Sequence, residues 1–293
     1  MGKIPESELV LNPDGSVYHL KLRPEHIANT VLIAGDPHRV NMISAHFDSI
    51  EHKIQNREFT THTGIYKGIR LTALSTGIGT DNIDIAINEL DAAVNINLES
   101  REIKDDFRKL EIIRLGTSGA LQADVEVDSC VISTHGLGLD GLLNFYKVPE
   151  GVIDQAMSQA FITHSSWDSN LSRPYIVKGS SYLLDQLGEG MTRGITATSP
   201  GFYGPQGRVL RLPLLEPEQN NKINSFSYKG ARITNYEMET SALYGLGKML
   251  GHETCTICAI IANRLAKEYS KDYKKTVEQM ISTVLERLST RVN

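Results

Sequence analysis

The feature that most constrains the fold is a series of short apolar segments spread along the whole chain. They lie at residues 31–35, 71–77, 111–117, 130–134, 194–199, 231–236 and 255–263. Most are apolar almost throughout, which is typical of strands that are covered on both faces. Helical patterns lie between several of them, and this alternation favours a mostly parallel sheet. The pattern therefore predicts an α/β fold in which ligands bind beyond the carboxyl ends of the strands.

Three amphipathic patterns indicate helices. Their apolar residues are Ile83, Ile87 and Leu90; Leu243, Leu246 and Leu250, with Gly251 as a stop; and Val277, Met280, Ile281, Val284, Leu285 and Leu288. The last set forms one stripe that we expect to face the core. No repeat, low-complexity tract or flexible linker divides the chain. We therefore expect one domain over residues 1–293, with residues 1–18 as an N-terminal extension.

The composition excludes several classes of function. The net charge of the 293 residues is −5 and no long basic run occurs, so nucleic acid is not an expected partner. No apolar stretch reaches the ~18 residues of a membrane helix. The first residues also lack the apolar core of a signal peptide. We expect a cytoplasmic protein with no membrane partner.

The three cysteines are Cys130, Cys255 and Cys258, and the last two form a C-x-x-C pair. That pair lies in an apolar, β-branched segment that reads as a buried strand, where residues three apart point to opposite faces. No second C-x-x-C occurs in the sequence. We predict that the pair is structural, and we expect no metal site.

Two strand ends carry residues suited to an anion. In VLIAGDPHRV the strand stops at Gly35, whose backbone N–H can approach an anion, and Arg39 can reach back from the first helical turn. A routine turn with a surface arginine is the alternative. In IIRLGTSGA, Arg114 lies inside an apolar strand and needs a partner, with Thr117 close by. An oxyanion would suit Arg114, and a buried salt bridge to a structural carboxylate is the alternative.

A third strand end, NYEMETSAL, carries two carboxylates where a helix begins. In an extended chain Glu237 and Glu239 point to the same face. Ionised carboxylates only accept hydrogen bonds, so they suit the vicinal hydroxyls of a sugar. The stretch is equally consistent with exposed charges at a helix N-terminus, which the helix dipole favours.

Two glycine-rich segments complete the candidate residues. In the loop SPGFYGPQGR, Phe202 can stack on a planar ring and Gln206 can both donate to and accept from its edge, with Arg208 nearby. An ordinary surface loop is the alternative there. In STGIGTDN the glycines can hold an anion or a sugar at a helix start, or equally form only a tight turn. Thr80 or Asp81 can cap the next helix, and we expect Asp81 to do so and to face away from the site.

Together these segments resemble a known family. GDPHRV, REFTTHTG, STGIG, IIRLGTSGA, GFYGPQGR, NYEMET and ANR occur in the order and approximate spacing of the hexameric and uridine phosphorylase type of nucleoside phosphorylases, from His19 to Arg264. Purine-cleaving members carry an aspartate where this chain has Asn263-Arg264. With Gln206 and Arg208 in the loop, the resemblance is closest to the uridine-cleaving branch.

The resemblance implies a single-domain, three-layer α/β/α fold with a mixed central sheet, and phosphate-dependent cleavage of uridine to uracil and ribose 1-phosphate. It implies phosphate binding by Gly35, Arg39, Arg114 and Thr117, and by Arg57 of a neighbouring subunit; ribose binding by Thr117, Glu237, Met238 and Glu239, and by His19 across a subunit boundary; and base binding by Phe202, Gln206, Arg208 and Arg264. Arg114, Gln206 and Arg208 would carry the catalysis. It implies no cofactor besides the co-substrate phosphate, and a homodimer or a hexamer with shared active sites.

The chain also departs from the family pattern. It has Thr80-Asp81-Asn82 where bacterial relatives often carry Gly-Pro-Ser. Some relatives bind a monovalent cation through a serine at the position of Asn82, so the resemblance does not imply that site in this chain. The segments at 98–109 and 146–190 are longer than in compact bacterial members. Three alternatives stay open: a purine nucleoside phosphorylase, a nucleosidase that uses water, and a nucleoside-binding protein without catalysis.

Overall fold

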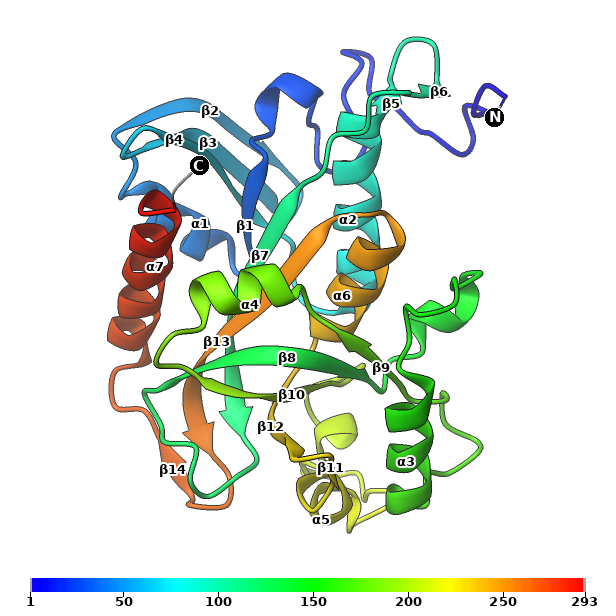
Figure 1. Cartoon of the computed structure of the whole chain (residues 1–293), viewed down its shortest axis with the longest axis vertical. Coiled ribbons are helices and arrows are strands. Elements are labelled where there is room, and N and C mark those ends of the chain that lie inside the picture. The colour runs from blue at the N-terminus through cyan, green and yellow to red at the C-terminus, as the bar shows by residue number, and fades with distance from the viewer. Residues whose placement is uncertain (1, 292–293) are drawn as a thin grey trace.

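The computed structural model describes residues 2–291 and contains a large mixed sheet with helices on both faces (Figure 1). The strands are β1 (Thr30–Ala34), β2 (Ser49–Asn56), β3 (Phe59–Tyr66), β4 (Ile69–Ser75), β5 (Ile96–Asn97), β6 (Glu102–Ile103), β7 (Glu111–Ala120), β8 (Cys130–Gly138), β9 (Tyr175–Lys178), β10 (Thr192–Thr198), β11 (Ser227–Tyr228), β12 (Ala231–Glu237), β13 (Glu253–Asn263) and β14 (Glu268–Tyr269). The α-helices are α1 (Pro37–Ser44), α2 (Thr80–Asn95), α3 (Gln155–Ser165), α4 (Ser181–Leu187), α5 (Gln219–Asn224), α6 (Thr240–Met249) and α7 (Tyr273–Ser289). Short 3-10 helices are η1 (Pro24–His26), η2 (Leu142–Phe145) and η3 (Gly204–Gln206).

The sheet is more mixed than the strand pattern alone predicts. Its order is β11-β12-β10-β8-β13-β7-β1-β4-β3-β2, and β12 also pairs with β7, which closes five strands into a ring. The pairings of β1 with β4 and β7 are parallel, as expected. The pairings of β7 with β13 and of β10 with β8 and β12 are parallel as well. The expectation of a mostly parallel sheet is wrong for β2, β3 and β4, which are joined by short turns that only antiparallel neighbours allow. The mixed sheet implied by the family resemblance is confirmed.

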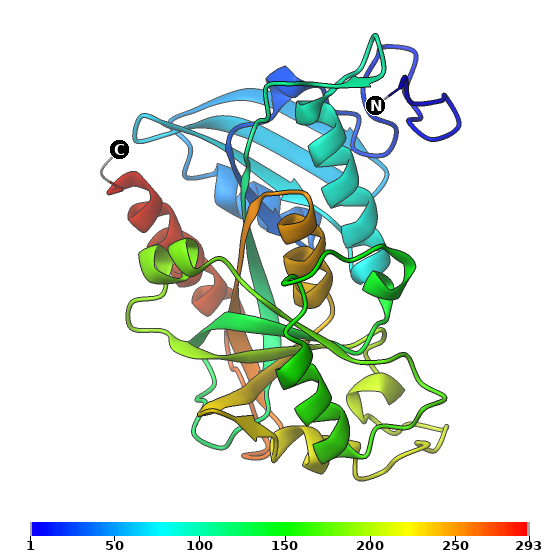
Figure 2. The same ribbon diagram turned by 45° about the vertical axis from the view of Figure 1, so that its right-hand side comes forward.

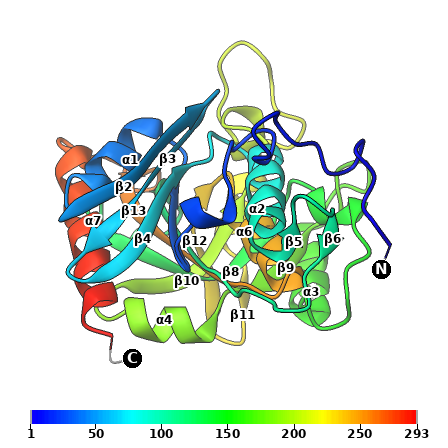
Figure 3. The same cartoon turned by 90° about the horizontal axis from the view of Figure 1, so that it is seen from above.

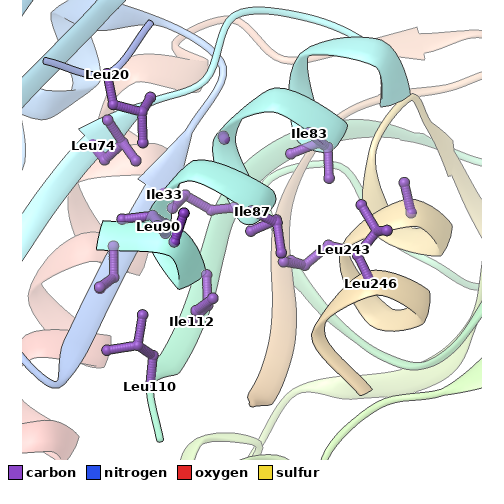
Figure 4. Close-up of a cluster of buried hydrophobic side chains, with 14 of the residues drawn as sticks. Leu20, Ile33, Leu74, Ile83, Ile87, Leu90, Leu110, Ile112, Leu243 and Leu246 are labelled. Carbon is purple, nitrogen blue, oxygen red and sulfur yellow. The ribbon is translucent and has the colours of Figure 1, made fainter. Parts of the chain in front are cut away.

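Two apolar clusters lie on opposite faces of the sheet and make three layers. Along β1, Val31 and Ile33 pack toward α2 and α6, whereas Leu32 packs toward α1 and α7. Figure 3 shows α7 and the α2–α6 pair on opposite sides of the sheet. In Figure 4, Ile87 of α2 and Leu243 of α6 meet above the sheet. The three-layer α/β/α fold is therefore confirmed.

The predicted helices are present and bury the predicted stripes. The buried side chains of α7 include all six apolar residues of the C-terminal pattern. In α6, Leu243 and Leu246 are buried, and Gly251 has φ +83° just beyond the helix, a left-handed conformation that suits glycine as a helix stop. The strand–helix junction expected at NYEMET lies between Glu237 and Thr240.

The N-terminal segment and the two insertions pack against this frame. Leu9 and Val17 belong to the α2–α6 cluster, so the segment before residue 18 is part of the packed body. The hairpin β5–β6 lies beside it, and Ile4 N donates to Arg101 O at 2.8 Å. The second insertion supplies α3, α4 and the strand β9, which pairs with β8. Figure 2 shows α3 below the α2–α6 pair.

Cys255 and Cys258 are free, buried and on opposite faces of β13, as the strand reading predicted. Cys255 joins the cluster under α7, whereas Cys258 Sγ lies 3.0 Å from where a Cβ of Gly116 would be. Over residues 2–291, no three His, Cys, Asp or Glu side chains gather as a metal site would require. None of the helices in this described range is long and apolar enough to cross a membrane.

Candidate active site

Two glycine turns bring the carboxyl ends of β1 and β4 together. A Cβ atom at Gly35 would lie 3.1 Å from the carbonyl oxygen of Gly77, so the two backbones meet with little room for a side chain. Helix α2 then starts at Thr80 with Gly79 as its N-cap residue, and Asp81 is exposed in the first turn without a capping hydrogen bond. The expectation that Asp81 caps α2 is therefore wrong, since the N-cap position belongs to a glycine, which has no side chain to accept a bond.

Arg114 finds its partners in the two carboxylates of NYEMET. Its Nη1 lies 3.1 Å from Glu237 Oε2, and its Nη2 donates to Glu239 Oε2. All three side chains are buried, at 4–5% exposure. The sequence left open whether Arg114 meets a carboxylate or an oxyanion, and the carboxylate is present.

The surroundings of the two glutamates differ. Glu237 accepts from Thr198 Oγ1 at 2.7 Å, from Glu239 N at 2.9 Å and from Thr240 N at 3.0 Å. Glu239 accepts from Gly79 N at 2.9 Å, which ties α6 to the glycine turn before α2. Neither glutamate is an exposed charge on a helix end, so that alternative is excluded.

These contacts set the charges of the cluster. Burial disfavours the charged guanidinium, but the facing carboxylates hold the pKa of Arg114 above its usual value. Burial raises the pKa of the Glu239 carboxyl, and the charge of Arg114 opposes that rise. The positive charge of Arg114 therefore makes it possible to bury the carboxylates of Glu237 and Glu239, which would otherwise be unpaired.

Arg39 adds a second cation without a carboxylate of its own. It is 9% exposed, and its Nη1 donates to Leu115 O at 2.9 Å. Within residues 2–291 no carboxylate oxygen lies within ion-pair distance of it. Burial, and then the charge of Arg114, lower the pKa of Arg39. An anion placed here would relieve the repulsion between the two guanidinium groups.

We call Arg39, Arg114, Glu237 and Glu239 the charged floor. Thr117 is half-buried three residues after Arg114 in β7, opposite Ala259 of β13, and Met238 is half-buried between the two glutamates. Gly35, Arg39 and Arg114 of the predicted phosphate set thus lie at the same end of the sheet as the predicted ribose set.

The base loop, residues 199–208, holds its predicted residues in contact with one another. The guanidinium carbon of Arg208 lies 3.8 Å from the centre of the Phe202 ring, and Arg208 Nη1 donates to Gln206 Oε1 at 2.6 Å. Arg264 Nη2 donates to Gly207 O at 3.1 Å, and its Nη1 donates to Gln206 O. Arg264 thus holds the backbone of the loop, and its predicted part in binding the base stays a prediction. In Figure 3 the segment around the loop, drawn in yellow-green, stands out from the body.

Tyr236 is a candidate that the sequence analysis missed. It is 3% exposed, and its hydroxyl has no hydrogen-bond partner among the described residues. Burial raises its pKa to about 12, against the nearby polar side chains of Gln219 and Ser199 and the charges of Arg264 and Arg208. Gln219 Nε2 and Ser199 Oγ donate to Pro205 O instead, which leaves the Tyr236 hydroxyl as a group that a ligand can satisfy. Its position in NYEMET, one residue before Glu237, was the available signal.

His19 and Arg57 lie together, with no contact to the charged floor in this chain. Asn56 Nδ2 donates to His19 O at 2.8 Å, and Arg57 Nη2 donates to Tyr18 Oη at 3.3 Å. His19 Nδ1 lies 2.6 Å from Glu89 Oε1. Their predicted roles need a neighbouring subunit and stay predictions.

Asn263 is turned away from any base. Its Nδ2 donates to Gln122 O and Val125 O, both at 2.9 Å, and its Oδ1 accepts from Leu265 N and Ala266 N, both at 3.0 Å. It is 1% exposed. All its hydrogen-bonding groups are therefore used inside the protein.

Comparisons with known proteins fit this geometry. The sequence profile of the phosphorylase superfamily matches residues 29–292. A uridine phosphorylase of Thermococcus kodakarensis is 31% identical over 98% of this chain and 92% of its own length. A DeoD-type purine nucleoside phosphorylase of Alkaliphilus metalliredigens is 26% identical over 92% of this chain and 97% of its own.

The solved structures agree with the sequences. A Trypanosoma brucei nucleoside phosphorylase, described as showing uridine phosphorylase activity, superposes with a TM-score of 0.87 at 28% identity, over 97% of this chain and all of that one. Sequence and structure therefore match the same family over nearly the whole chain, which belongs to the phosphorylase superfamily.

Proposed function

We propose that this protein is an enzyme that cleaves uridine with phosphate to give uracil and ribose 1-phosphate. The observation that carries the proposal is the charged floor, in which buried Arg39 has no carboxylate in ion-pair contact among residues 2–291 and lies close enough to Arg114 for the two charges to repel. The relatives named as uridine phosphorylases, from Thermococcus kodakarensis and from other organisms, support the same substrate.

Phosphate is the anion that this floor suits. In the proposed complex Arg39 and Arg114 hold its oxygens, with Gly35 and Thr117 at its edge. Two guanidinium groups fix an oxyanion in direction as well as in place, because each presents a planar fork of donors. Held in this way, a phosphate oxygen attacks C1′ of the ribose while the bond from C1′ to the base nitrogen breaks.

The ribose is proposed to lie over Met238 and Glu239. Glu239 accepts from the ribose hydroxyls, because one of its oxygens is bound by Gly79 N and the other by Arg114, and both keep lone pairs. Its negative charge also favours the positive charge that develops on the sugar. Glu237 has the lesser part, since each of its oxygens already accepts from at least two protein donors, whereas Glu239 Oε1 accepts only from Gly79 N among the described residues.

The uracil leaves with negative charge on its carbonyl oxygens. Because Gln206 Oε1 accepts from Arg208, the two N–H donors at Gln206 Nε2 remain for the base, and Arg208 adds its own charge. Phe202 offers a ring face for stacking, and Tyr236 a buried hydroxyl. No protein acid is needed to protonate a leaving group that is stabilised as an anion.

The alternative as a purine nucleoside phosphorylase is disfavoured by Asn263. In the purine branch an aspartate at this place protonates the purine ring. The side-chain amide of Asn263 instead uses both its nitrogen and its oxygen in hydrogen bonds to backbone groups. A nucleosidase has no need of the two arginines, and a mere binding protein has no need of an attacking phosphate.

Oligomeric state, the absence of a cofactor and a cytoplasmic location remain predictions. A shared active site is supported by His19 and Arg57, whose segments are hydrogen-bonded to each other and which make no hydrogen bond or ion pair with the floor among the described residues. Complementation tests it: a mixture of Arg57→Ala and Arg208→Ala subunits, unfolded and refolded together, should recover activity well above that of either variant alone. No recovery would contradict shared sites.

The assay that tests the function is uridine cleavage with and without phosphate. We expect uracil release only when phosphate is present, and equal rates in both would contradict the proposal. A panel of uridine, deoxyuridine, thymidine, inosine and adenosine, each with phosphate, then tests the base. Faster cleavage of inosine or adenosine than of uridine would favour the purine alternative.

A further inference from the structure

The far side of Glu237 is bound to a buried hydroxyl that the proposed chemistry does not use. Thr198, the last residue of β10, pairs in register with Glu237 at the end of β12 and is fully buried. Its Oγ1 donates to Glu237 Oε1 at 2.7 Å. The other carboxylate oxygen, Oε2, faces Arg114 Nη1 at 3.1 Å. Thr198 therefore acts on the same carboxylate as Arg114, from the opposite side.

The direction of this hydrogen bond is fixed by a backbone group. Ser241 N donates to Thr198 Oγ1 at 3.0 Å, and a backbone N–H can only donate. Thr198 has one hydroxyl proton, which must therefore point to Glu237. Removal of the hydroxyl would leave a backbone donor without a partner and remove the shortest contact of Glu237 Oε1.

The side chain of Ser241 is itself hydrogen-bonded to the carboxylate of Asp140. Its Oγ donates to Asp140 Oδ2 at 2.8 Å, and Tyr175 Oη donates to Asp140 Oδ1 at 2.9 Å. Burial raises the pKa of Asp140, and its hydrogen bonds oppose that rise. A chain of hydrogen bonds thus runs from Asp140 through Ser241 and Thr198 to Glu237.

We propose that Thr198 is a positioning residue that acts through Glu237 to set the place of Arg114 for phosphate. Because both oxygens of Glu237 already accept from protein donors, its main effect on the reaction passes through Arg114. The inference rests on the proposed function, since it takes Arg114 as a phosphate ligand.

The chain offers a matched control in the same strand. Thr196 lies two residues before Thr198 in β10, is equally buried, and donates to Asn235 Oδ1 at 2.9 Å instead of to Glu237. Thr196→Val therefore removes a buried hydroxyl of the same kind without touching the floor. Thr198→Ser keeps the hydroxyl and should rescue the effect.

The test compares steady-state kinetics of these variants with calorimetric titration of inorganic phosphate. For Thr198→Val we expect the KM for phosphate to rise about tenfold, as the loss of a hydrogen bond to a charged group predicts, while the KM for uridine changes less than about twofold. Thr196→Val and Thr198→Ser should keep the wild-type KM for phosphate. Calorimetry of phosphate alone should show the same loss of affinity for Thr198→Val only.

Several outcomes would overturn the inference. An unchanged KM for phosphate in Thr198→Val, or an equal change in Thr196→Val, would assign Thr198 a merely structural role. If Thr198→Val is not recovered folded, Thr198→Ala is measured in the same way and judged by the same values. A wild-type enzyme that cleaves uridine without phosphate would overturn the proposed function itself, whereas a phosphate-dependent enzyme with an insensitive Thr198 overturns this inference alone.

Discussion

The charged floor is proposed to bind phosphate and ribose, and the base loop is proposed to bind uracil, but the two regions are built in opposite ways. In the floor, Arg114, Glu237 and Glu239 come from β7 and the β12–α6 junction and are buried by the sheet. In the loop, Phe202 is 50% exposed, and Arg208 is held by a side chain and a ring of the same short segment. The floor depends on the fold, whereas the loop depends mostly on itself. Function and stability should therefore be coupled in the floor and separable in the loop.

The largest expected effect is that of Arg114→Ala. Its loss leaves two carboxylates buried without their cation, which should cost about 3–5 kcal/mol of the free energy of unfolding and at least about a hundredfold in kcat/KM. Burial already raises the pKa of Glu239, and loss of Arg114 should raise it further. A carboxyl whose pKa is raised on folding favours the folded state at low pH, and that contribution is lost as the pH rises through the folded pKa.

The stability deficit of Arg114→Ala should therefore be smaller at pH 5 than at pH 8. Urea unfolding of the variant and the wild type at both pH values measures it. If the stability deficit is equal at both pH values, or if the variant is as stable as the wild type, then function and stability are not coupled in the floor.

Arg208→Ala tests the other half of the comparison. We expect about a hundredfold loss in kcat/KM for uridine, because a donor to the leaving group is removed, with a change of less than about 1 kcal/mol in stability. Arg211→Ala, an exposed arginine a few residues further along the chain, is the matched control and should leave both unchanged. Loss of the folded state in Arg208→Ala would contradict a loop that is independent of the core.

Arg39→Ala sharpens the contrast within the floor itself. Because Arg39 has a backbone carbonyl as its partner and lies near another cation, its loss should cost little stability. The KM for phosphate should rise about tenfold or more. Thermal unfolding and phosphate kinetics, with surface Arg193→Ala as control, measure the two effects. A destabilisation as large as that of Arg114→Ala would mean that Arg39 is structural.

The smallest expected effect is on the two buried thiols of β13, of which Cys258 contacts Arg114 of the floor. Burial raises the pKa of Cys258 to about 11 and that of Cys255 to about 12. Both should remain protonated at pH 8 and fail to react with Ellman's reagent in the folded enzyme, while all three cysteines react in denaturant. Rapid reaction of Cys258 in the folded state would show that the floor opens.

The regular elements and the need of Arg114 for a partner could be predicted from the sequence. Apolar segments and stripes mark strands and helices because burial acts on each side chain locally, as in α7. An arginine inside the strand β7 likewise demands a counter-charge wherever the partner lies in the sequence.

The identity of that partner could not be predicted. Arg114 and Glu239 are 125 positions apart, and they meet because β7 pairs with both β12 and β13 in the closed part of the sheet. The parallel pairing of β10 with β12, which places Thr198 beside Glu237, is also a long-range property. Tyr236 and Thr198 could not be identified as candidate site residues from the sequence for the same reason. Whether a hydroxyl has no partner or is shared between two groups depends on neighbours that are distant in the sequence.

The central claim is that phosphate, and not water, accepts the ribose. Phosphorus NMR of the enzyme with uridine and phosphate tests it most directly, because a sugar phosphate and free phosphate give separate resonances. We predict that a new phosphate ester signal grows in equal amount with the uracil released. Release of uracil while the phosphate signal stays constant would contradict the account.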